Sequence, residues 1–421
     1  IVKSRKIHTQ SDFALAGRAL TPWVLVGTML ASWIGTGSIL GNAGKTYETG
    51  LAALMLPIGS ILGIILLTRI AGKVRSYEKY TVPEIIGDRY GPVARNLSVF
   101  ALVMAYMVIV SYQYNAGGAV LYTVLADNTG TSIISIELAT IIAAVFIIAY
   151  TMLAGLLSVA YTDAANSIIM TLALVISLPI LWIKAGSWSG METAFAAMNK
   201  SQHMQFGGVY STMDIINFCL PPFLLVIGDA NMYQRFSASK DVQSARYSTT
   251  ILVFAVLFIE LLIIGSAWVS SSLIPEAEVG KHVLIYAAHQ FLPTFLGAIM
   301  LTTIVGIIIS TADSFLLVPA NTLIRDIYLN YINPQASEKN IVRLSRLLVL
   351  LLGIIAYIVS IGFSKSAGFF ERALYAYTIY GAAITPALLA ALFWRGATKE
   401  GAVASIICGT LVTLFWKELP G

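Results

Sequence analysis

Hydroxyl and carboxylate side chains interrupt one of the most apolar segments of the chain, residues 290–324. Residues 310–314 of that segment read Ser-Thr-Ala-Asp-Ser. In a helix, at about 100° per residue, five residues would share one arc of roughly 160°: Ile307, Ser310, Thr311, Asp313 and Ser314. Three hydroxyls and a carboxylate are hard oxygen ligands, which suit small hard cations. The pattern indicates a cation site, whereas hydroxyls that bond only their own helix would leave Asp313 without a partner.

Another carboxylate stands where a second apolar segment, residues 160–184, begins. Asp163 follows Ser-Val-Ala-Tyr-Thr. Asp is a preferred helix cap, but carboxylates inside membrane segments also relay ions or protons, and both interpretations stay open. Asp229 is interpreted as interfacial, and the pattern gives no role to Glu260, in the middle of an apolar segment. The absence of a His/Cys cluster argues against a transition metal.

The composition indicates that these carboxylates belong to a membrane protein. Of the 421 residues, 57% are hydrophobic and 11% are charged, against about 25% charged in ordinary soluble domains. Charge-free runs such as 97–126 and 138–162 exceed the roughly 20 apolar residues that cross a bilayer. We therefore expect an all-α polytopic membrane protein. This excludes a soluble enzyme, a nucleic-acid binder and an outer-membrane barrel, whose strands alternate.

Apolar windows bounded by charges, Gly and Pro predict eleven spans. They are 21–44, 50–74, 93–125, 133–155, 160–184, 212–236, 246–274, 290–324, 341–363, 368–394 and 399–420. With this count, most of the 26 Lys and Arg residues fall on one side of the membrane. The positive-inside rule makes that side cytoplasmic. We therefore expect a multi-pass protein of the cell membrane, plasma or inner, with the residues before span one in the cytoplasm.

Spans one and six carry helix-breaking residues at matching positions. Span one contains Gly-Thr-Gly-Ser at 35–38, and span six contains Pro221-Pro222. Both breaks would free backbone groups, which are tolerated at membrane depth only when buried or lining a cavity. Interrupted helices in two inverted halves predict a transporter site at the midplane. The expected division is 1–20 as lead-in, 21–184 as the first five-helix repeat, 185–211 as an external linker, 212–395 as the second, inverted repeat, and 396–421 as an additional helix.

Short motifs along essentially the whole chain resemble the sodium:solute symporter family. They are SDFALAGR at 11–18, ASWIGTG at 31–37, TVPE at 81–84, AGLLSVAYTD at 154–163, YQR at 233–235, STADS at 310–314 and RDIY at 325–328. The sequences of spans five and eight are similar to those of the choline- and proline-type branches. The resemblance implies the leucine-transporter-like fold, in which two inverted five-helix repeats carry broken helices one and six.

The resemblance also implies sodium as the coupling ion, at one or two sites. The first sodium would lie between spans one and eight, held by the carbonyls of Ala31, Ile34 and Ile307 and the side chains of Ser310 and Thr311. A second sodium, present in some members, maps onto Asp163, Ser310, Asp313 and Ser314. Asp313 stands where most members have a hydroxyl, and Asn166 where many have Gln.

The resemblance places the solute at the two breaks. By position, the pocket would include Gly35, Ser38, Pro57, Pro222, Phe223 and Val226. The polar-aromatic pair Tyr112 and Gln113 in span three is added from its residue types, and Tyr375 and Tyr377 are candidates for an outer gate. Positions that recognise sugars or sialic acid in relatives are Gly, Pro or aliphatic here. An amino acid or a quaternary amine is therefore favoured over a sugar.

Together these expectations describe sodium-coupled symport of a small organic solute by alternating access. Two alternatives stay open. Asp163 and Asp313 could together carry a proton in place of sodium, since neighbouring carboxylates hold protons at neutral pH, or the chain could be the transporter-like sensor of a signalling protein. No Ser/His pair or metal motif predicts an enzyme, and no partner other than the solute and the lipid bilayer is implied.

Overall fold

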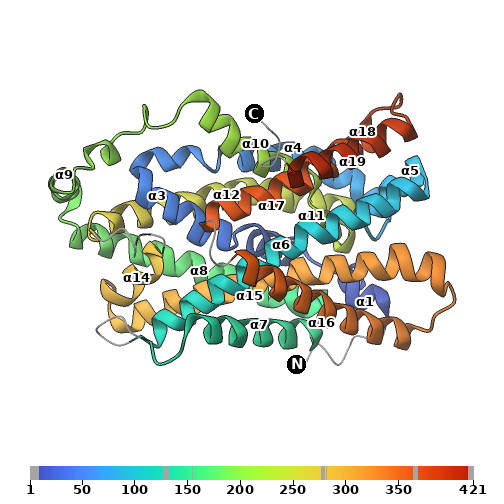
Figure 1. Cartoon of the computed structure of the whole chain (residues 1–421), viewed down its shortest axis with the longest axis horizontal. Coiled ribbons are helices and arrows are strands. Elements are labelled where there is room, and N and C mark those ends of the chain that lie inside the picture. Colours follow the sequence, from blue (N-terminus) through green and yellow to red (C-terminus); the bar gives the residue numbers. More distant parts are fainter. Residues whose placement is uncertain are drawn as a thin grey trace.

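The computed structural model describes residues 9–126, 132–153, 155–275, 280, 282–363 and 368–415. Within these ranges every regular element apart from two isolated bridges is a helix, which confirms the predicted all-α class. Residues 1–8 of the expected lead-in, Ala154 of one motif and residues 416–421 of the last expected span lie outside the described residues. Figure 1 shows the long helices side by side in one elongated bundle.

The helices follow one another with short connections. The first half contains α1 (Gln10–Leu15), η2 (Ala16–Arg18), α2 (Pro22–Trp33), η3 (Gly37–Asn42), α3 (Ala43–Thr49), η4 (Gly50–Met55), α4 (Ile58–Ser76), α5 (Val82–Tyr90), α6 (Pro92–Val124), α7 (Ile136–Leu153) and α8 (Leu156–Lys184). After α9 (Ser187–Ala197) and η5 (Ser201–Met204), the second half contains α10 (Thr212–Gly228), α11 (Ala230–Ala238), α12 (Val242–Ser271), α14 (Val283–Gln290), α15 (Thr294–Thr322), η6 (Leu323–Ile332), α16 (Glu338–Phe363), α17 (Phe369–Ala383), α18 (Thr385–Phe393) and α19 (Lys399–Phe415).

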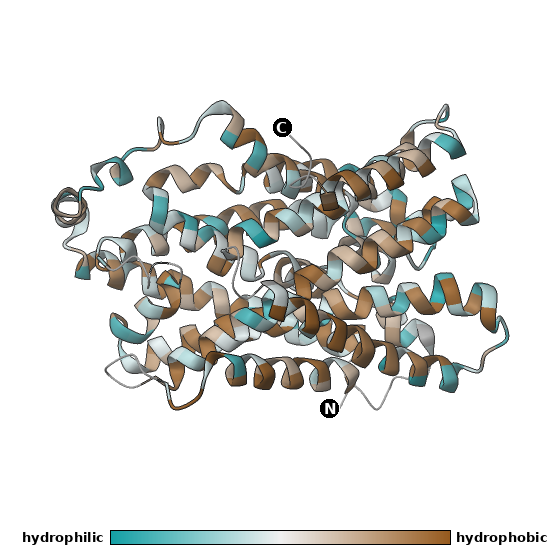
Figure 2. Cartoon of the chain, viewed as in Figure 1, coloured by the Kyte–Doolittle hydropathy of each residue, from teal (hydrophilic) through white to brown (hydrophobic). Residues whose placement is uncertain are grey.

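Each of the eleven predicted spans coincides with a helix, but not every helix qualifies as a span. Among the described residues, eight helices are long and apolar enough to cross a membrane, or nine when the bent pair α2 and η3–η4 counts as one. Helix α4 carries Arg69, Lys73 and Arg75 within 19 residues, and α19 has only 17 residues. Figure 2 shows hydrophobic residues along the middle of the bundle and hydrophilic ones gathered towards its ends.

The break predicted in span one is present. Helix α2 ends at Trp33, and the chain bends by 51° before it continues as η3. The backbone at Ile34 leaves the helical region, with φ −76° and ψ 87°. Helix α2 packs against α8, α12 and α15, so the bend lies inside the bundle. The flexible Gly-Thr-Gly sequence therefore produces a discontinuity where no lipid reaches it.

The break predicted at Pro221-Pro222 in span six is wrong in position. Helix α10 runs through both prolines, and the discontinuity is at Asp229, where φ is −59° and ψ is 114°. Proline fixes φ near the helical value, and its cost in a helix is the missing N–H bond and the clash with the preceding turn. Phe218 and Pro222 line a cavity, and irregular backbone at membrane depth is tolerated at such a place.

The close approach of α2 and α8 depends on Gly27. A Cβ atom at this position would lie 2.6 Å from the Cα of Ala164 and 2.7 Å from its Cβ. We expect Gly27→Ala to push the two helices apart and to cost about 1–3 kcal/mol of stability, the usual range for overpacking. Unfolding of the purified protein in detergent measures this loss.

Gly362→Ala is the matched control for Gly27→Ala. Gly362 is also helical, and a Cβ there would meet nothing within 4 Å. Alanine should therefore leave stability unchanged or raise it by about 0.5–1 kcal/mol, the helix preference of Ala over Gly. Equal effects of the two substitutions would contradict the close approach at Gly27.

Candidate ion and solute site

The bend after α2 releases two backbone carbonyls. In a continuous helix the Gly35 amide would donate to Ala31, but it donates to the Trp33 carbonyl at 3.0 Å. The Ser38 amide would donate to Ile34, but it donates to the Gly35 carbonyl at 3.1 Å. The carbonyls of Ala31 and Ile34, both in buried residues, therefore lack their helical donors. Carbonyl oxygens of unwound membrane helices are typical ligands of Na⁺.

Helix α15 brings its predicted hydroxyls to this bend. Thr311 Oγ1 donates to the Ala31 carbonyl at 3.3 Å, and a Cβ at Gly35 would lie 2.9 Å from the Thr311 side chain. Ile307 is buried one turn earlier on the same helix. Ser310 differs from the expectation in its direct contact, because its hydroxyl donates to Asp163 rather than to the bend. Thr311 is thus the hydroxyl in contact with the released carbonyl of Ala31.

Asp163 lies within α8 and faces α2 and α15. The helix-cap interpretation is wrong, because α8 begins at Leu156. The Asp163 carboxylate is buried. It accepts hydrogen bonds from Thr28 Oγ1 at 2.6 Å and from Ser310 Oγ at 2.5 Å. The side chain of Asp163 in α8 therefore links α2 and α15.

Sequence reasoning missed the cation beside Asp163. Arg235 of α11 is fully buried, and its Nη2 lies 3.6 Å from Asp163 Oδ2. Its guanidinium also donates to Ser314 Oγ at 2.6 Å, to Thr28 Oγ1 at 3.0 Å and to the Asn231 carbonyl at 3.2 Å. The available signal was the need of a membrane-buried carboxylate for a charged partner.

The four residues predicted for a second sodium do not form one cluster. Asp163 and Ser310 are in direct contact, and Arg235 links Asp163 to Ser314. Asp313 is buried on another side of α15, where its carboxylate accepts a hydrogen bond from Thr151 of α7. Of the predicted second set, Asp163 and Ser314 therefore contact a guanidinium, Ser310 contacts Asp163, and Asp313 faces α7.

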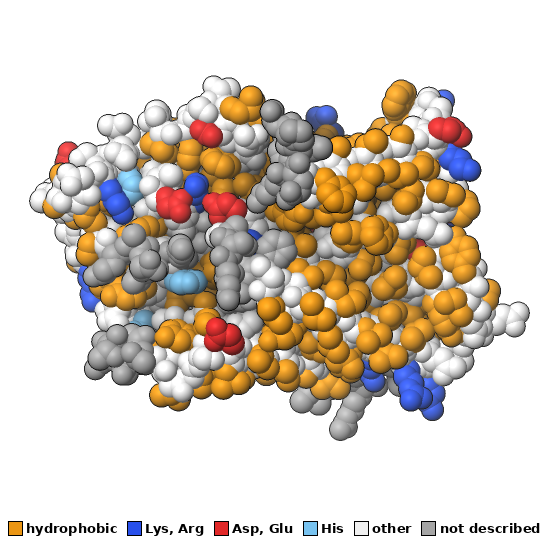
Figure 3. Space-filling model, viewed as in Figure 1, with side chains coloured by type: hydrophobic (Ala, Val, Ile, Leu, Met, Phe, Trp, Pro, Cys, Tyr) orange, Lys and Arg blue, Asp and Glu red, His pale blue; other side chains and the backbone are white. Residues whose placement is uncertain are grey.

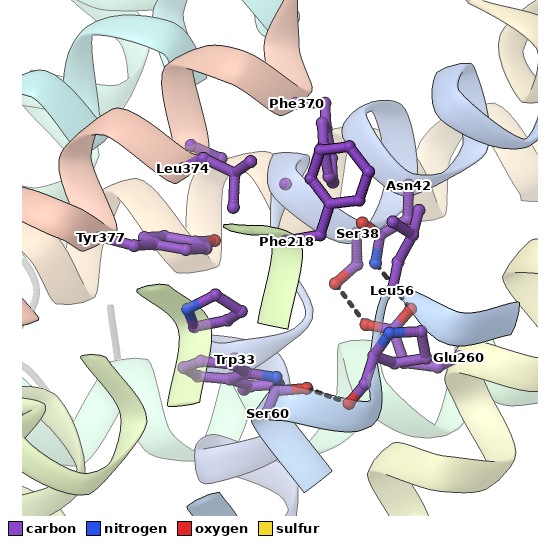
Figure 4. Close-up of a pocket in the computed structure, with 14 residues that line it drawn as sticks. Trp33, Ser38, Asn42, Leu56, Ser60, Phe218, Glu260, Phe370, Leu374 and Tyr377 are labelled. Atoms are coloured by element: carbon purple, nitrogen blue, oxygen red, sulfur yellow. Dashed lines mark hydrogen bonds between the residues drawn. The ribbon is translucent and has the colours of Figure 1, made fainter. Parts of the chain in front are cut away.

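A pocket opens on the other side of the α2 bend (Figure 4). Its walls come from α2, η3, η4, α4, α10, α12 and α17. The lining residues are Trp33, Gly37, Ser38, Asn42, Leu56, Pro57, Ser60, Phe218, Pro222, Glu260, Phe370, Ala373, Leu374 and Tyr377. Three predicted solute contacts, Ser38, Pro57 and Pro222, are among them.

Five other predicted solute contacts lie behind the pocket wall. Gly35 packs against Thr311, and Val226 packs in the core against Gly63 of α4. Phe223 is partly buried beside the same core, and Tyr112 is fully buried in α6. Gln113 does not line the pocket but contacts the bend, because Thr36 donates to its Oε1. These residues shape the site from behind rather than lining it in this conformation.

Glu260 is the charged residue of the pocket, and sequence reasoning gave it no role. The side chain of this α12 residue is 1% exposed. Its two carboxylate oxygens accept hydrogen bonds from Ser38 Oγ at 2.6 Å and from Asn42 Nδ2 at 3.0 Å. Both donors belong to the segment after the bend. A charged residue in the middle of a span was the available signal.

Two tyrosines form hydrogen bonds at the break in span six. Asp229 is buried rather than interfacial, and Tyr106 Oη donates to its Oδ1 at 2.5 Å. Tyr380 Oη donates to the Gly228 carbonyl at 2.8 Å and accepts from the Ala230 amide at 3.2 Å. The two tyrosine rings stack, with centroids 5.4 Å apart. Tyr380 of α17 thus satisfies the backbone that the break exposes, and Tyr106 of α6 bonds the Asp229 carboxylate beside it.

A larger cavity lies between the pocket and one end of the bundle. Charged residues line it, including Lys45, Glu48, Glu137, Glu371 and Arg372, and Phe370 lines both this vestibule and the pocket. Tyr377, a predicted gate, lies in the pocket wall, and Tyr375 does not line either cavity. Figure 3 shows several acidic side chains gathered on one half of the molecule and mostly hydrophobic ones on the other.

The other end of the bundle is closed by the first helix. Helix α1 packs against α8, α11, α15 and α16. Gln234 Nε2 of α11 donates to the Ala14 carbonyl at 2.8 Å, and the Lys240 amide donates to the Leu20 carbonyl at 3.2 Å. Nearby, Arg95 pairs with the buried Asp326 of η6 at 2.5 Å. These contacts tie α1 to α11 and α6 to η6.

The family model of the sodium:solute symporter family matches residues 13–409. The chain therefore belongs to the sodium:solute symporter family. It is a sodium-coupled transporter of a small organic solute and a multi-pass membrane protein, not an enzyme. A sodium/proline symporter of Haemophilus influenzae is 27% identical over 97% of this chain and 83% of its own length. An osmoregulated proline transporter of Bacillus subtilis is 26% identical over 98% of this chain and 84% of its own length.

Solved structures share the fold. A Na⁺-coupled sialic acid symporter in a substrate-bound outward-open state matches with a TM-score of 0.80 at 14% identity, over 99% of this chain and 94% of its own. A nucleobase-cation-symport-1 family transporter matches with a TM-score of 0.58 at 13% identity, over 97% of this chain and 95% of its own. These matches confirm the leucine-transporter-like fold.

Proposed function

We propose that the chain carries an amino acid, with proline as the first candidate, together with sodium by alternating access. The curated relatives described above are proline transporters. The observation that carries the proposal is the α2 bend, where the released Ala31 carbonyl accepts from Thr311 on one side while Trp33 and Ser38 line the pocket on the other. Ion and solute would then act on the same few residues of backbone.

The coupling ion is proposed to sit between the α2 bend and α15. Its ligands would be the carbonyls of Ala31, Ile34 and Ile307 with the hydroxyls of Ser310 and Thr311. Sodium at this joint would hold the bend in the shape that forms the pocket wall. By linkage, an ion that tightens solute binding is itself bound more tightly by the same factor when solute is present.

A single sodium is proposed for each solute in this chain. Two of the four residues that map onto a second sodium, Asp163 and Ser314, already contact the Arg235 guanidinium, and a third, Ser310, donates to Asp163. A cation at that place neutralises Asp163. A sodium ion added beside Arg235 would meet like-charge repulsion at low dielectric. Arg235 would therefore serve as a built-in cation where other members of the fold carry an ion.

The vestibule is proposed to open to the outside and the α1 end to face the cytoplasm, in agreement with the basic residues near α1, α4 and α5. In this arrangement Phe370 separates the solute pocket from the outer water. Residues 21–184 and 212–395 are proposed to be the two inverted repeats, which rock against each other around the site. The contacts of α1 with α11 and α15 would break when the inner side opens.

Uptake into proteoliposomes tests the proposal. With radiolabelled L-proline outside, an inward sodium gradient should drive accumulation, and an equal potassium gradient should not. Uptake driven by a pH gradient in sodium-free buffer would overturn sodium coupling. It would favour proton transfer at Asp313, whose buried carboxylate is bonded to Thr151 rather than to a cation. If a sodium gradient drives uptake of another class of solute but not of proline, only the choice of solute is overturned.

A further inference from the structure

The solute pocket contains a buried carboxylate that lacks a cationic partner. Glu260 is 1% exposed, and both of its hydrogen-bond donors, Ser38 and Asn42, are neutral. Within the described ranges Glu260 forms no ion pair with Lys, Arg or His. Two other buried carboxylates, Asp163 and Asp326, each face an arginine. Asp229 and Asp313 are also buried and form no ion pair within the described ranges, but neither lines the pocket. A buried charge is costly unless it is paired, so Glu260 is poised for a counter-charge from outside the chain.

Aromatic rings also line the pocket. Trp33 and Tyr377 stack with ring centroids 6.3 Å apart, and Phe218 meets Phe370 edge to face at 5.3 Å. Figure 4 shows Trp33 and Tyr377 across the pocket from Glu260. Aromatic faces attract ammonium groups, most strongly when water is excluded. The pocket therefore combines a carboxylate with several rings, the combination that recognises a positively charged nitrogen.

Lys45 does not supply the missing charge. Its ammonium lies 5.9 Å from the ring centroids of both Phe218 and Phe370, on the vestibule side of the pocket, and it pairs with Glu48 at 2.8 Å. Lys45 is not among the residues that line the pocket. The two phenylalanine rings thus stand between the nearest lysine and the interior where Glu260 lies.

We infer that Glu260 and the aromatic rings of Trp33 and Tyr377 bind a positively charged nitrogen of the solute, so that the transported class is ammonium-bearing solutes. The inference rests on the proposed function, because it assigns the solute of that same pocket. Glu260 is then a specificity-determining residue. Ser38 and Asn42, which hold its carboxylate, belong to the segment after the α2 bend. Ordering of that bend by sodium would also orient Glu260, which couples ion binding to recognition of the nitrogen.

Two pairs of probes that differ mainly in the charged nitrogen test the inference on the unmodified chain. L-proline is compared with cyclopentanecarboxylate, which lacks the ring nitrogen, and choline with 3,3-dimethyl-1-butanol, in which carbon replaces that nitrogen. A bound ligand raises the apparent melting temperature of the folded protein. In saturating sodium, we expect at least one nitrogen-bearing probe to bind about tenfold or more tightly than its partner. Equal responses within both pairs, or no response to either nitrogen-bearing probe, overturn the inference.

Glu260→Gln and Glu260→Asp extend the test to the residue itself. Gln removes the charge and should weaken binding of the nitrogen-bearing probe about tenfold or more, since hydrogen bonds to charged groups are stronger than those between neutral groups. Asp keeps the charge and should retain part of the affinity. Glu192→Gln removes an exposed carboxylate of α9 and should behave like the wild type. Unchanged discrimination within the probe pairs in Glu260→Gln would overturn the assignment.

Stabilisation by sodium without solute separates a failure of the proposed sodium-coupled function from a failure of the Glu260 assignment. The ion site is built from α2 and α15, so sodium in place of potassium should still raise the melting temperature of Glu260→Gln. Loss of discrimination together with a retained sodium response supports the inference. Should the wild type fail to respond to sodium at all, the proposed function fails. If Glu260→Gln does not fold, Glu260→Asp and the probe pairs on the wild type still decide the outcome.

Discussion

Replacing Ser310 and Thr311 together by alanine is expected to raise the sodium concentration for half-maximal uptake by about tenfold or more. The two hydroxyls are proposed ligands of the ion, and loss of one hydrogen bond or ligand contact to a charged group costs about 1.5–3 kcal/mol. Each 1.4 kcal/mol corresponds to about a factor of ten in affinity. The maximal uptake rate at saturating sodium should change less than this requirement. Initial rates in proteoliposomes over a range of sodium concentrations measure both quantities.

Thr302→Ala provides the control for this double variant. Thr302 lies on the same helix, α15, but is exposed, so its loss should leave the sodium requirement unchanged. Single variants separate the two ligands. Thr311→Ala should account for most of the effect, because Thr311 contacts the Ala31 carbonyl whereas Ser310 bonds to Asp163. An unchanged sodium requirement in the double variant would place the ion elsewhere.

Asp163→Asn is expected to destabilise the protein strongly. The substitution removes the carboxylate beside the fully buried Arg235. Breaking a buried ion pair by removing one partner costs about 3–5 kcal/mol, because an uncompensated charge remains. Adding Arg235→Met should recover part of this loss, since the double variant buries no charge at the site. Unfolding in detergent of the two single variants and the double variant forms a complete cycle.

The same variants test the number of ions. If Arg235 takes the place of a second sodium, wild-type uptake should depend on sodium with a Hill coefficient near one. Arg235→Met would leave the oxygens of Asp163, Ser310 and Ser314 without a cation, and its stability should become dependent on sodium over potassium. The role of Arg235 as a built-in cation would be refuted by two results together. These are additive stability effects of Asp163→Asn and Arg235→Met, and a sigmoidal dependence of wild-type uptake on sodium.

The sequence predicts those features that depend on local pattern. Apolar windows between charges, Gly and Pro identify every long helix. The Gly-Thr-Gly sequence at 35–37 marks the first bend because glycine loses more backbone freedom in a helix than any other residue. The stripe from Ser310 to Ser314 follows from helical spacing. Because this spacing fixes only the direction of each side chain, it did not reveal that Asp313 faces α7 while Ser310 faces α8.

Features that depend on partners from distant segments could not be predicted. By local pattern the prolines of span six are the better helix breakers, but α10 ends at Asp229, where Tyr380 bonds the opened backbone and Tyr106 bonds the Asp229 carboxylate. Arg235 and Glu260 each look unremarkable within their own segments. Their roles arise from Asp163, 72 positions before Arg235 in the chain, and from the segment that follows the α2 bend. Such pairings are set by the tertiary fold.

The position of Phe370 has a kinetic consequence. This residue lines both the vestibule and the pocket, so rotation of one ring could admit or release a solute while the helices stay in place. Side chains reorient far faster than the microsecond-to-millisecond rocking of whole domains. A solute would then enter and leave many times before each crossing of the membrane. Under such rapid exchange, the Michaelis constant for uptake approaches the dissociation constant of the outward-facing carrier.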